Sequence, residues 1–356
     1  MARGNMVALV VAGIFLASAL CVSAAGTLTF EEVTSTGDSA FAFDPNSNQE
    51  YTPPPTPIVP PPPSPTVPAP TAPTTPASSP GSCPEDFTKN FQNTFKIFTD
   101  TDHVIVGPNG DSAEMLLDKR TAAVAGTKNM YYTGRFSAWL KLPCGNSSGT
   151  VFAFYLSSNG SKPDHDEIDI EILGNTTDKT YTLQTNIFVN GYGNREMRHD
   201  LVWFEPCQDY HEYFIQWNSA LTVIGVDDVP LRVFYNKESE DIGQPYFNKG
   251  QALMMSYWDG SKWATQGGKY KCDFEKNGPF IADIKDFHKL QGCQVPWERD
   301  VAACKNPATP HCWDAQTELT PEQVASMNSH KQYCTYDYCQ DYQRFKDTGF
   351  PKDCSN

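Results

Sequence analysis

Positive charge is scarce in this sequence. Its 27 lysines and arginines stand against 42 aspartates and glutamates, which gives a formal net charge of −15 over 356 residues. A surface of that sign repels nucleic acid and anionic lipid head groups, so neither is expected as a partner. It also disfavours strongly acidic polysaccharides. The charge therefore favours a neutral polymer as partner.

Long apolar runs are also rare, and the one candidate lies at the N-terminus. Arg3 precedes an almost uninterrupted apolar run over residues 6–21, and small residues follow it at 22–24. This order predicts a signal peptide over residues 1–24 and a secreted protein. An uncleaved signal anchor is the alternative, because the run through Ala25 approaches the ~20 residues that span a bilayer. No other segment is apolar enough, so no stable membrane contact is expected.

Paired CxxC motifs are absent, which argues against a zinc site; we predict neither a metal nor another cofactor. Of the 11 cysteines, Cys21 lies in the predicted leader, so ten remain. An even number of cysteines in an exported chain indicates disulfides. Six cysteines fall late, and six allow 15 pairings, so the connectivity stays open at this point. These six are Cys293, Cys304, Cys312, Cys334, Cys339 and Cys354.

Proline is distributed unevenly and divides the chain. Fourteen of the 28 prolines lie between Pro53 and Pro80. Residues 25–82 are therefore predicted to be disordered, first acidic and then proline-rich and extended, because this composition cannot bury a core. The segment is either a semi-rigid spacer or an O-glycosylated tether to a cell wall. A globular domain is expected at 83–286 and a cysteine-rich C-terminal extension at 287–356.

Short runs of β-branched and aromatic residues, separated by Gly, Asn, Asp and Pro, follow the proline-rich segment. They predict an all-β fold, a sandwich of two antiparallel sheets. The expected strands are residues 136–142, 151–156, 181–188, 210–217, 221–226, 231–235 and 253–258. One helix is predicted from Pro321 to about Gln332, because residues 320–323 form a capping box with proline at the first helical position.

Residues 167–172 alternate strictly between acids and isoleucines. On a strand this places Glu167, Asp169 and Glu171 on one face and the isoleucines on the other. The Cα atoms of Glu167 and Glu171 are then ~13 Å apart. Side chains that lean together approach the ~5–5.5 Å of a retaining glycosidase pair rather than the ~6.5–9.5 Å of an inverting one. Asp169 would hydrogen-bond one carboxyl and tune its pKa.

Two other interpretations of this strand remain open. A solvated strand face usually mixes charges of both signs, whereas this one carries three acids and no lysine or arginine. A calcium site would need an acidic cation-binding loop, and the sequence shows none of that pattern. The residues alone therefore favour catalysis on a glycosidic bond.

The segment His165–Gly174, with the sequon at Asn175 after it, resembles the active-site strand of xyloglucan endotransglucosylase/hydrolases. These are the plant cell-wall members of glycoside hydrolase family 16. The likeness runs from about Phe91 to Cys354, and its last part resembles the C-terminal extension of the family. The other matching segments are residues 145–158, 181–188, 195–196, 217–218, 229–232 and 263–268, with Trp258.

The resemblance implies a jelly-roll sandwich with an open cleft and a retaining mechanism. It implies Glu167 as nucleophile, Glu171 as general acid/base and Asp169 as an assisting residue. The implied substrate contacts are Tyr155, Gln184, Asn186, Arg195, Glu196, Trp258, Trp263 and Gly268. The implied disulfides are Cys293–Cys304 and Cys339–Cys354.

Several features depart from the family pattern or add to it. Ser148 creates a second sequon at Asn146, and Asn159 begins a third. Trp258 and Trp263 stand in a polar, glycine-containing stretch, where an indole can stack on a sugar ring, whereas Trp217 is expected in the core. His165 is expected to support a carboxylate rather than to act as a base.

The expected function is transfer of a β-1,4-glucan chain, cleaved through a glycosyl-enzyme, to another glucan chain during cell-wall construction and remodelling. The expected donor and acceptor are xyloglucan or a related neutral β-glucan. A monomer in the cell wall and apoplast is expected. One alternative is an endo-hydrolase of xyloglucan or mixed-linkage glucan. Another is a non-catalytic glucan-binding wall protein, against which the intact acid triplet argues.

Overall fold

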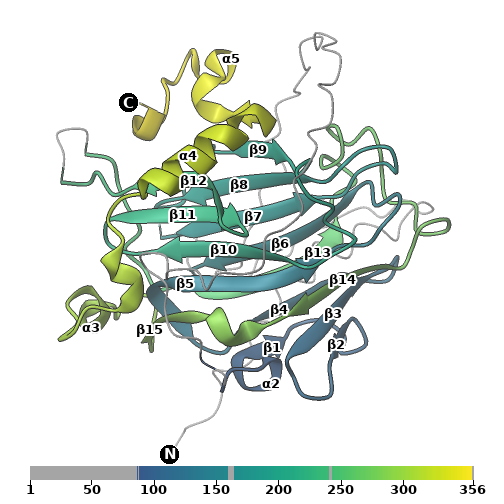
Figure 1. The fold of residues 1–356 in the computed structure, drawn as a ribbon, viewed down its shortest axis with the longest axis horizontal. Coiled ribbons are helices and arrows are strands. Elements are labelled where there is room, and N and C mark those ends of the chain that lie inside the picture. Colours follow the sequence, from purple (N-terminus) through teal and green to yellow (C-terminus); the bar gives the residue numbers. More distant parts are fainter. Residues whose placement is uncertain (1–85, 87, 159–163, 240–242, 355–356) are drawn as a thin grey trace, which may run out of the picture.

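The computed structural model describes residues 86, 88–158, 164–239 and 243–354. The predicted leader, the segment 25–82 and the sequon at Asn159 lie outside these residues. Two antiparallel sheets pack face to face, and short helices lie at their margins (Figure 1). The predicted all-β sandwich is confirmed. Within the described ranges, no helix has both the length and the apolar character needed to cross a membrane.

The first sheet, here called the site sheet, has the strand order β1-β4-β13-β6-β7-β8-β9-β16. Every neighbouring pair in it is antiparallel. Its strands are β1 (Phe95–Ile97), β4 (Ala123–Thr127), β6 (Thr150–Ser157), β7 (Glu167–Leu173), β8 (Thr182–Phe188), β9 (Met197–Asp200), β13 (Ala252–Asp259) and β16 (Cys334–Asp337). β7 therefore lies in the interior of the sheet, between β6 and β8.

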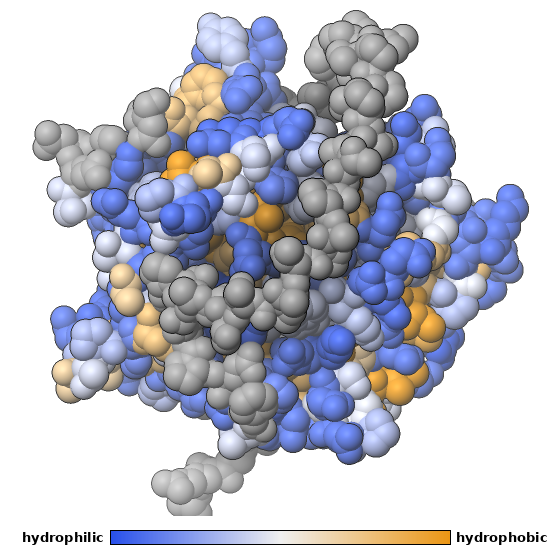
Figure 2. Space-filling view, in the orientation of Figure 1, coloured by the Kyte–Doolittle hydropathy of each residue, from blue (hydrophilic) through white to orange (hydrophobic). Residues whose placement is uncertain are grey.

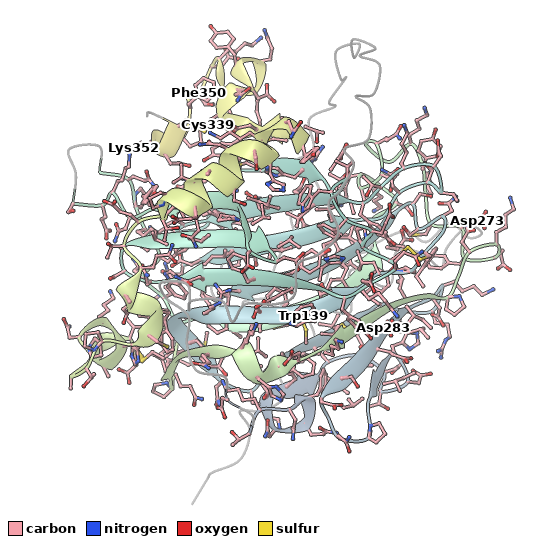
Figure 3. All side chains as sticks on the ribbon, in the orientation of Figure 1. Trp139, Asp273, Asp283, Cys339, Phe350 and Lys352 are labelled. Carbon is pink, nitrogen blue, oxygen red and sulfur yellow. A yellow bond between two sulfur atoms is a disulfide. The ribbon has the colours of Figure 1, made fainter. Side chains whose placement is uncertain are left out.

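The second sheet, here called the outer sheet, has the order β12-β11-β10-β5-β14-β3-β2, and β15 also pairs with β5. Its strands are β2 (Val104–Val106), β3 (Ser112–Leu117), β5 (Met130–Lys141), β10 (His211–Trp217), β11 (Leu221–Val226), β12 (Val229–Tyr235), β14 (Phe280–Lys285) and β15 (Gln291–Val295). All seven strand segments predicted from the sequence are present. In Figure 3, Trp139 of β5 and Asp283 of β14 mark this sheet, and Asp273 lies in the connection from β13 to β14.

In the part of the chain that the structure describes, the helices are short except for one. They are α2 (Phe91–Thr94), α3 (Ala302–Lys305), α4 (Pro321–His330), α5 (Tyr342–Phe345) and the 3-10 turns η2 (Phe287–Lys289), η3 (Cys312–Ala315), η4 (Lys331–Tyr333), η5 (Tyr338–Gln340) and η6 (Lys352–Cys354). The predicted capping box of α4 is confirmed, because the Thr320 hydroxyl accepts from Gln323 N at 3.2 Å. This helix lies across β12 on the outer sheet (Figure 1).

The core lies between the inner faces of the two sheets. Aromatic side chains fill much of it, and Trp217, Phe152 and Phe136 are all fully buried. The predicted core position of Trp217 is confirmed. On the face shown in Figure 2, hydrophilic side chains predominate, as expected of a surface that faces water.

Three disulfides join described residues. Cys293–Cys304 and Cys339–Cys354 are the two pairs that the family resemblance implied, and both are confirmed. The third, Cys144–Cys207, joins the segment after β5 to the segment before β10. Cys312 is also disulfide-bonded, whereas Cys334 is a free thiol. Cys339 lies in the C-terminal extension, near the upper edge of the molecule in Figure 3.

Candidate active site

Strand β7 presents its acids and its isoleucines to opposite sides of the site sheet. Ile168, Ile170 and Ile172 are at most 1% exposed and belong to the core between the sheets. Because side chains alternate along a strand, Glu167, Asp169 and Glu171 lie on the opposite side. We call this side, with its cross-strand neighbours, the acid face. The alternation predicted from the sequence is confirmed.

Strands β6 and β8 supply the side chains that flank these acids. Asp169 is paired with Tyr155 on one side and with Asn186 on the other. Glu171 is paired with Ala153 and with Gln184. Directly paired residues in an antiparallel sheet point to the same face. Three of the expected substrate contacts, on β6 and β8, therefore lie on the acid face beside the carboxylates.

Asp169 is the buried member of the triplet, with 6% of its surface exposed. Burial raises the pKa of Asp169 well above its usual value, and the neighbouring charges of Glu167 and Glu171 raise it further. A side-chain hydrogen bond to Glu167 acts in the same direction. The Asp169 carboxyl therefore holds its proton more tightly than an ordinary aspartate, and in the protonated form its hydroxyl can donate to the Glu167 carboxylate.

Glu171 also holds a proton more tightly than an ordinary glutamate. Burial raises the pKa of Glu171 to about 7, and the charge of Glu167 adds to the effect. A hydrogen bond from Gln184 Nε2 to Glu171 Oε2, 2.6 Å long, opposes it, as does the charge of Arg198. A carboxyl with a pKa near neutrality is suited to exchange protons as a general acid and base.

His165 lies at the beginning of β7, close to the first acid. Its Nε2 is 3.3 Å from Glu167 Oε2, and its ring meets the ring of Phe188 edge to face. Phe188 is the cross-strand neighbour of Glu167 on β8. The imidazole thus lies within reach of the Glu167 carboxylate, and its supporting role remains a prediction.

An apolar and aromatic patch adjoins the end of β7. Leu173 packs with Val151 and Ala264, and the indoles of Trp258 and Trp263 pack against these three. The two indole rings are 6.1 Å apart between centroids. The patch places two flat aromatic rings near the last acid of the strand, where they can stack on sugar rings.

A pocket of about 150 Å³ lies beside this patch, past Glu171 along β7. It is lined by Leu173, Gly174, Asn175, Thr182, Arg198, Ala264, Thr265, Gln266, Gly267 and Thr335. The loop that forms one wall needs glycine at position 268, where φ is +80° and a Cβ atom would come within 2.4 Å of Lys262 O. Gly268 directly follows the lining residues of this loop, and its conformation lets the chain pass close to Lys262.

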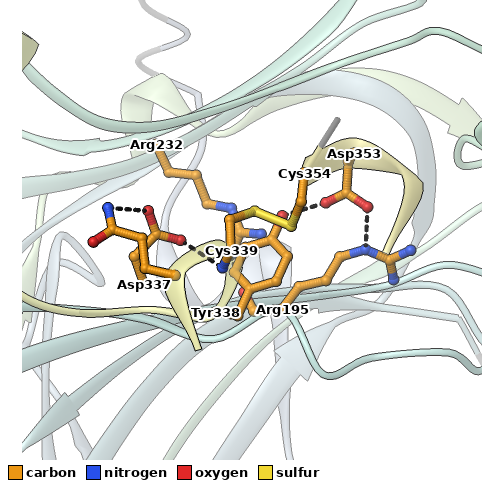
Figure 4. The surroundings of a disulfide bond; sticks show 8 residues. Arg195, Arg232, Asp337, Tyr338, Cys339, Asp353 and Cys354 are labelled. Carbon is orange, nitrogen blue, oxygen red and sulfur yellow. Dashed lines mark hydrogen bonds and ion pairs between the residues drawn. A yellow bond between two sulfur atoms is a disulfide. The ribbon is translucent and has the colours of Figure 1, made fainter. Parts of the chain in front are cut away.

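Arg195 and Glu196 bind side chains of the C-terminal extension. Arg195 is buried, and its Nε donates to Asp353 Oδ1 at 3.0 Å (Figure 4). Glu196 accepts from Arg344 Nη1 at 2.7 Å and from Arg344 Nη2 at 3.2 Å. Their expected contacts with glucan remain predictions, since both side chains are engaged within the protein.

Two of the predicted glycosylation sites are in the described residues. Asn175 follows β7 and lies at the pocket, whereas Asn146 precedes β6. The side-chain oxygen Oδ1 of Asn146 accepts hydrogen bonds from the backbone nitrogen and the hydroxyl of Ser148. Within the described ranges, no three His, Cys, Asp or Glu side chains are placed together as metal ligands.

Three residues that are linked to Glu171 through Gln184 were not among the sequence-based candidates. Arg198 of β9 donates to Gln184 Oε1 at 2.7 Å, Tyr336 of β16 is its cross-strand neighbour, and Arg344 of α5 donates to the Tyr336 hydroxyl. More than 130 residues separate β9 from β16 in the sequence. No local pattern could have revealed that they pair.

Comparison with known proteins agrees with this geometry. The family profile "Glycosyl hydrolases family 16" matches residues 91–276, and "Xyloglucan endo-transglycosylase (XET) C-terminus" matches residues 308–354. A probable xyloglucan endotransglucosylase/hydrolase protein 8 of Arabidopsis thaliana is 39% identical over 75% of this chain and 87% of its own. Xyloglucan endotransglucosylase protein 34 of Populus tremula x Populus tremuloides is likewise 39% identical, over 75% and 87%. The chain thus belongs to the xyloglucan endotransglucosylase/hydrolases of glycosyl hydrolase family 16.

Proposed function

We propose that this protein is a retaining endo-transglycosylase that cuts a xyloglucan chain and joins the new end to another glucan chain. The observation that carries the proposal is the proton arrangement on β7. Burial and the neighbouring acids raise the pKa of Asp169, so that its carboxyl can donate a hydrogen bond to Glu167, while burial raises the pKa of Glu171 to about 7. One strand thus places the proposed nucleophile beside a carboxyl that can serve as the proton donor.

In the first half of the reaction, Glu167 attacks the anomeric carbon of the donor. Glu171 gives its proton to the oxygen of the leaving chain, and a covalent glycosyl-enzyme ester forms on Glu167. The ester removes the negative charge of Glu167, which is one of the causes that raise the pKa of Glu171. The pKa of Glu171 therefore falls, and the carboxylate becomes a base.

In the second half, Glu171 removes a proton from the hydroxyl of an acceptor. The acceptor oxygen attacks the anomeric carbon, the ester to Glu167 breaks, and Glu171 is protonated again for the next cycle. Two displacements at one carbon retain its configuration. Asp169 assists by stabilising the departing Glu167 carboxylate with its hydrogen bond.

Xyloglucan is the proposed substrate for two reasons. The names of the relatives include xyloglucan, and a neutral polymer is not repelled by the negative charge of this chain. The relatives are 39% identical over three quarters of the sequence. The chain has a net charge of −15, which does not oppose a neutral glucan. The proposed contacts are Tyr155, Gln184, Asn186, Trp258 and Trp263, with Gly268 shaping the loop.

Transfer of the glycosyl group to an acceptor sugar is proposed to be faster than its hydrolysis by water. Water competes at ~55 M, but a bound and aligned acceptor can reach an effective molarity of ~10⁵ M or more. Strand β16 of the C-terminal extension pairs with β9 and so widens the site sheet beyond the acids. This added strand supports an extended binding surface for an acceptor.

The proposed location is the cell wall, reached by secretion after cleavage of residues 1–24. The disulfides suit an oxidising compartment. The proposed organisation is a proline-rich tether over 25–82, a catalytic domain over 83–286 and the extension over 287–356, in a monomer. Mass spectrometry of the secreted protein tests the first point: a mature chain that still begins at Met1 would contradict cleavage.

The decisive experiment supplies xyloglucan with and without a labelled xyloglucan oligosaccharide. Transfer predicts label in the polymer and almost no new reducing ends without acceptor. Equal production of reducing ends in both samples would identify a hydrolase, and no change in chain length would identify a binding protein. A fluorinated donor should label Glu167; a labelled peptide without Glu167 would overturn the assignment of the nucleophile.

A further inference from the structure

Gln184 connects the general acid to an arginine. Its Nε2 donates to Glu171 Oε2 at 2.6 Å, and its Oε1 accepts from Arg198 Nε at 2.7 Å. An arginine can only donate, so it must face the amide oxygen of Gln184. The amide nitrogen is then turned toward Glu171. Arg198 therefore determines that the amide nitrogen of the buried Gln184, and not its oxygen, faces Glu171.

Arg198 is held in turn by the C-terminal extension. Its guanidinium lies over the Tyr336 ring, 5.6 Å from the ring centroid, and the two residues are cross-strand neighbours. The Tyr336 hydroxyl accepts from Arg344 Nη1 at 3.0 Å and bonds to Asp341 Oδ2 at 3.0 Å. The position of Arg198 thus depends on β16 and α5.

Arg344 also neutralises an acid that acts on the site. Its two terminal nitrogens donate hydrogen bonds to the Glu196 carboxylate, at 2.7 and 3.2 Å. Nη2 also donates to Asn194 Oδ1 at 2.9 Å. The charge of Glu196 raises the pKa of Glu171, and the charge of Arg198 lowers it. The titratable groups around Glu171 are Glu167 and Asp169 on β7, Tyr155 on β6, Glu196 and Arg198 at β9, and Tyr336 on β16.

We propose that β16 and α5 position the general acid, with Arg198 orienting the amide of Gln184 and Arg344 compensating Glu196. The proposal rests on the proposed function and adds a role for the extension inside the catalytic step. Arg198, Tyr336 and Arg344 are positioning residues in this scheme. Loss of Arg198 leaves the amide free to turn its oxygen toward Glu171, which then favours the protonated acid.

The first test compares the basic limb of the pH profile of kcat/KM in Arg198→Gln, Arg198→Lys and the wild type. Arg198→Gln should move that limb to higher pH by about one unit, a tenfold change in proton affinity. Arg198→Lys keeps a charged donor and should stay close to the wild type. Arg120→Gln, a remote arginine paired with Asp102 and Asp118, is the matched control. A higher KM with an unmoved limb would overturn the proposal.

The second test uses a rescue. Arg344→Gln leaves the Glu196 charge uncompensated and should also shift the limb to higher pH, whereas Arg344→Gln with Glu196→Gln should bring it back. A double variant that remains shifted as far as the single variant would count against the proposal. Equal thermal unfolding midpoints show that the variants are folded.

The two proposals fail in different ways. The pKa of Glu171 can be followed without substrate, from the ¹³C shift of its carboxyl carbon, assigned by its loss in Glu171→Gln. A wild type that acts on no glucan would refute the proposed function, while the carboxyl titration would still decide the role of Arg198. A carboxyl titration identical in Arg198→Gln and the wild type would refute the positioning role.

Discussion

Arg195 and Asp353, 158 residues apart in the sequence, form an ion pair of 3.0 Å with both side chains almost buried. Asp353 also accepts from the Tyr338 hydroxyl, and it is adjacent to Cys354 of the Cys339–Cys354 disulfide (Figure 4). The pair fastens the last residues of the extension to the segment between β8 and β9. Arg195, whose expected contact with glucan remains a prediction, thus also forms an ion pair within the protein.

Asp353→Asn is expected to destabilise the protein strongly. The change leaves the Arg195 charge buried without its partner, and removal of one member of a buried pair costs ~3–5 kcal/mol. Unfolding in denaturant, followed by circular dichroism, measures the loss. Lys119→Gln breaks an exposed pair with Glu275 and should leave the midpoint unchanged. Equal midpoints for the two variants would contradict the prediction.

The activity should depend on pH through Glu171. Its carboxyl must be protonated to release the leaving chain, and burial raises its pKa to about 7. We therefore expect kcat/KM to fall as pH rises through about 7. The Glu171→Gln variant can be assayed with a donor whose leaving group needs no proton. In that assay the fall of kcat/KM above about pH 7, the basic limb of the profile, should vanish. A limb that persists in that variant would assign the titration to another group.

The same shift predicts how stability depends on pH. The folded protein holds the Glu171 proton up to about pH 7, whereas the unfolded chain releases it near pH 4.5. Stability is therefore lost as pH rises through this window, by roughly 3 kcal/mol from this group. Glu171→Gln has no proton to lose and should gain stability over the wild type at pH 8, with the gain shrinking toward pH 4.5. Chemical denaturation at both pH values tests the sign.

The Cys144–Cys207 disulfide should contribute more stability than Cys339–Cys354. The first closes a loop across 63 residues and the second across 15. In the chain-entropy description these spans correspond to about 4 and about 3 kcal/mol. Paired replacement of each bridge by serines, with unfolding free energies compared, tests the order. A larger loss from the shorter bridge would show that native contacts, rather than the unfolded chain, decide the effect.

Local patterns explain most of what the sequence could predict. The acid and isoleucine alternation of 167–172 fixed the two faces of β7, and the capping box located the beginning of α4 at Pro321. The predicted end of that helix, near Gln332, falls in the turn η4 rather than at His330, because the last turn tightens to 3-10 geometry. The strand 221–226 was predicted with the bounds that it has.

Contacts between distant segments could not be predicted in this way. The pairing of β16 with β9 brings Tyr336 to Arg198, and neither residue lies in a local motif. The short strands β1 and β2 carry three residues each, too few to show a period. Cys144 and Cys207 come together only when β5 and β10 pair. The family likeness supplied two disulfides but not this one.

The pairing of β16 with β9 also sets an order for folding during synthesis. Strand β9 is complete at Asp200, but its outer edge has no partner until Asp337 has been made. At 5–20 residues per second, that delay is roughly 7 to 27 s. An unpaired strand edge is a template for the edges of other chains. The unfinished chain therefore exposes this edge of the site sheet for the whole of that interval, and the edge is closed only when the C-terminal extension arrives.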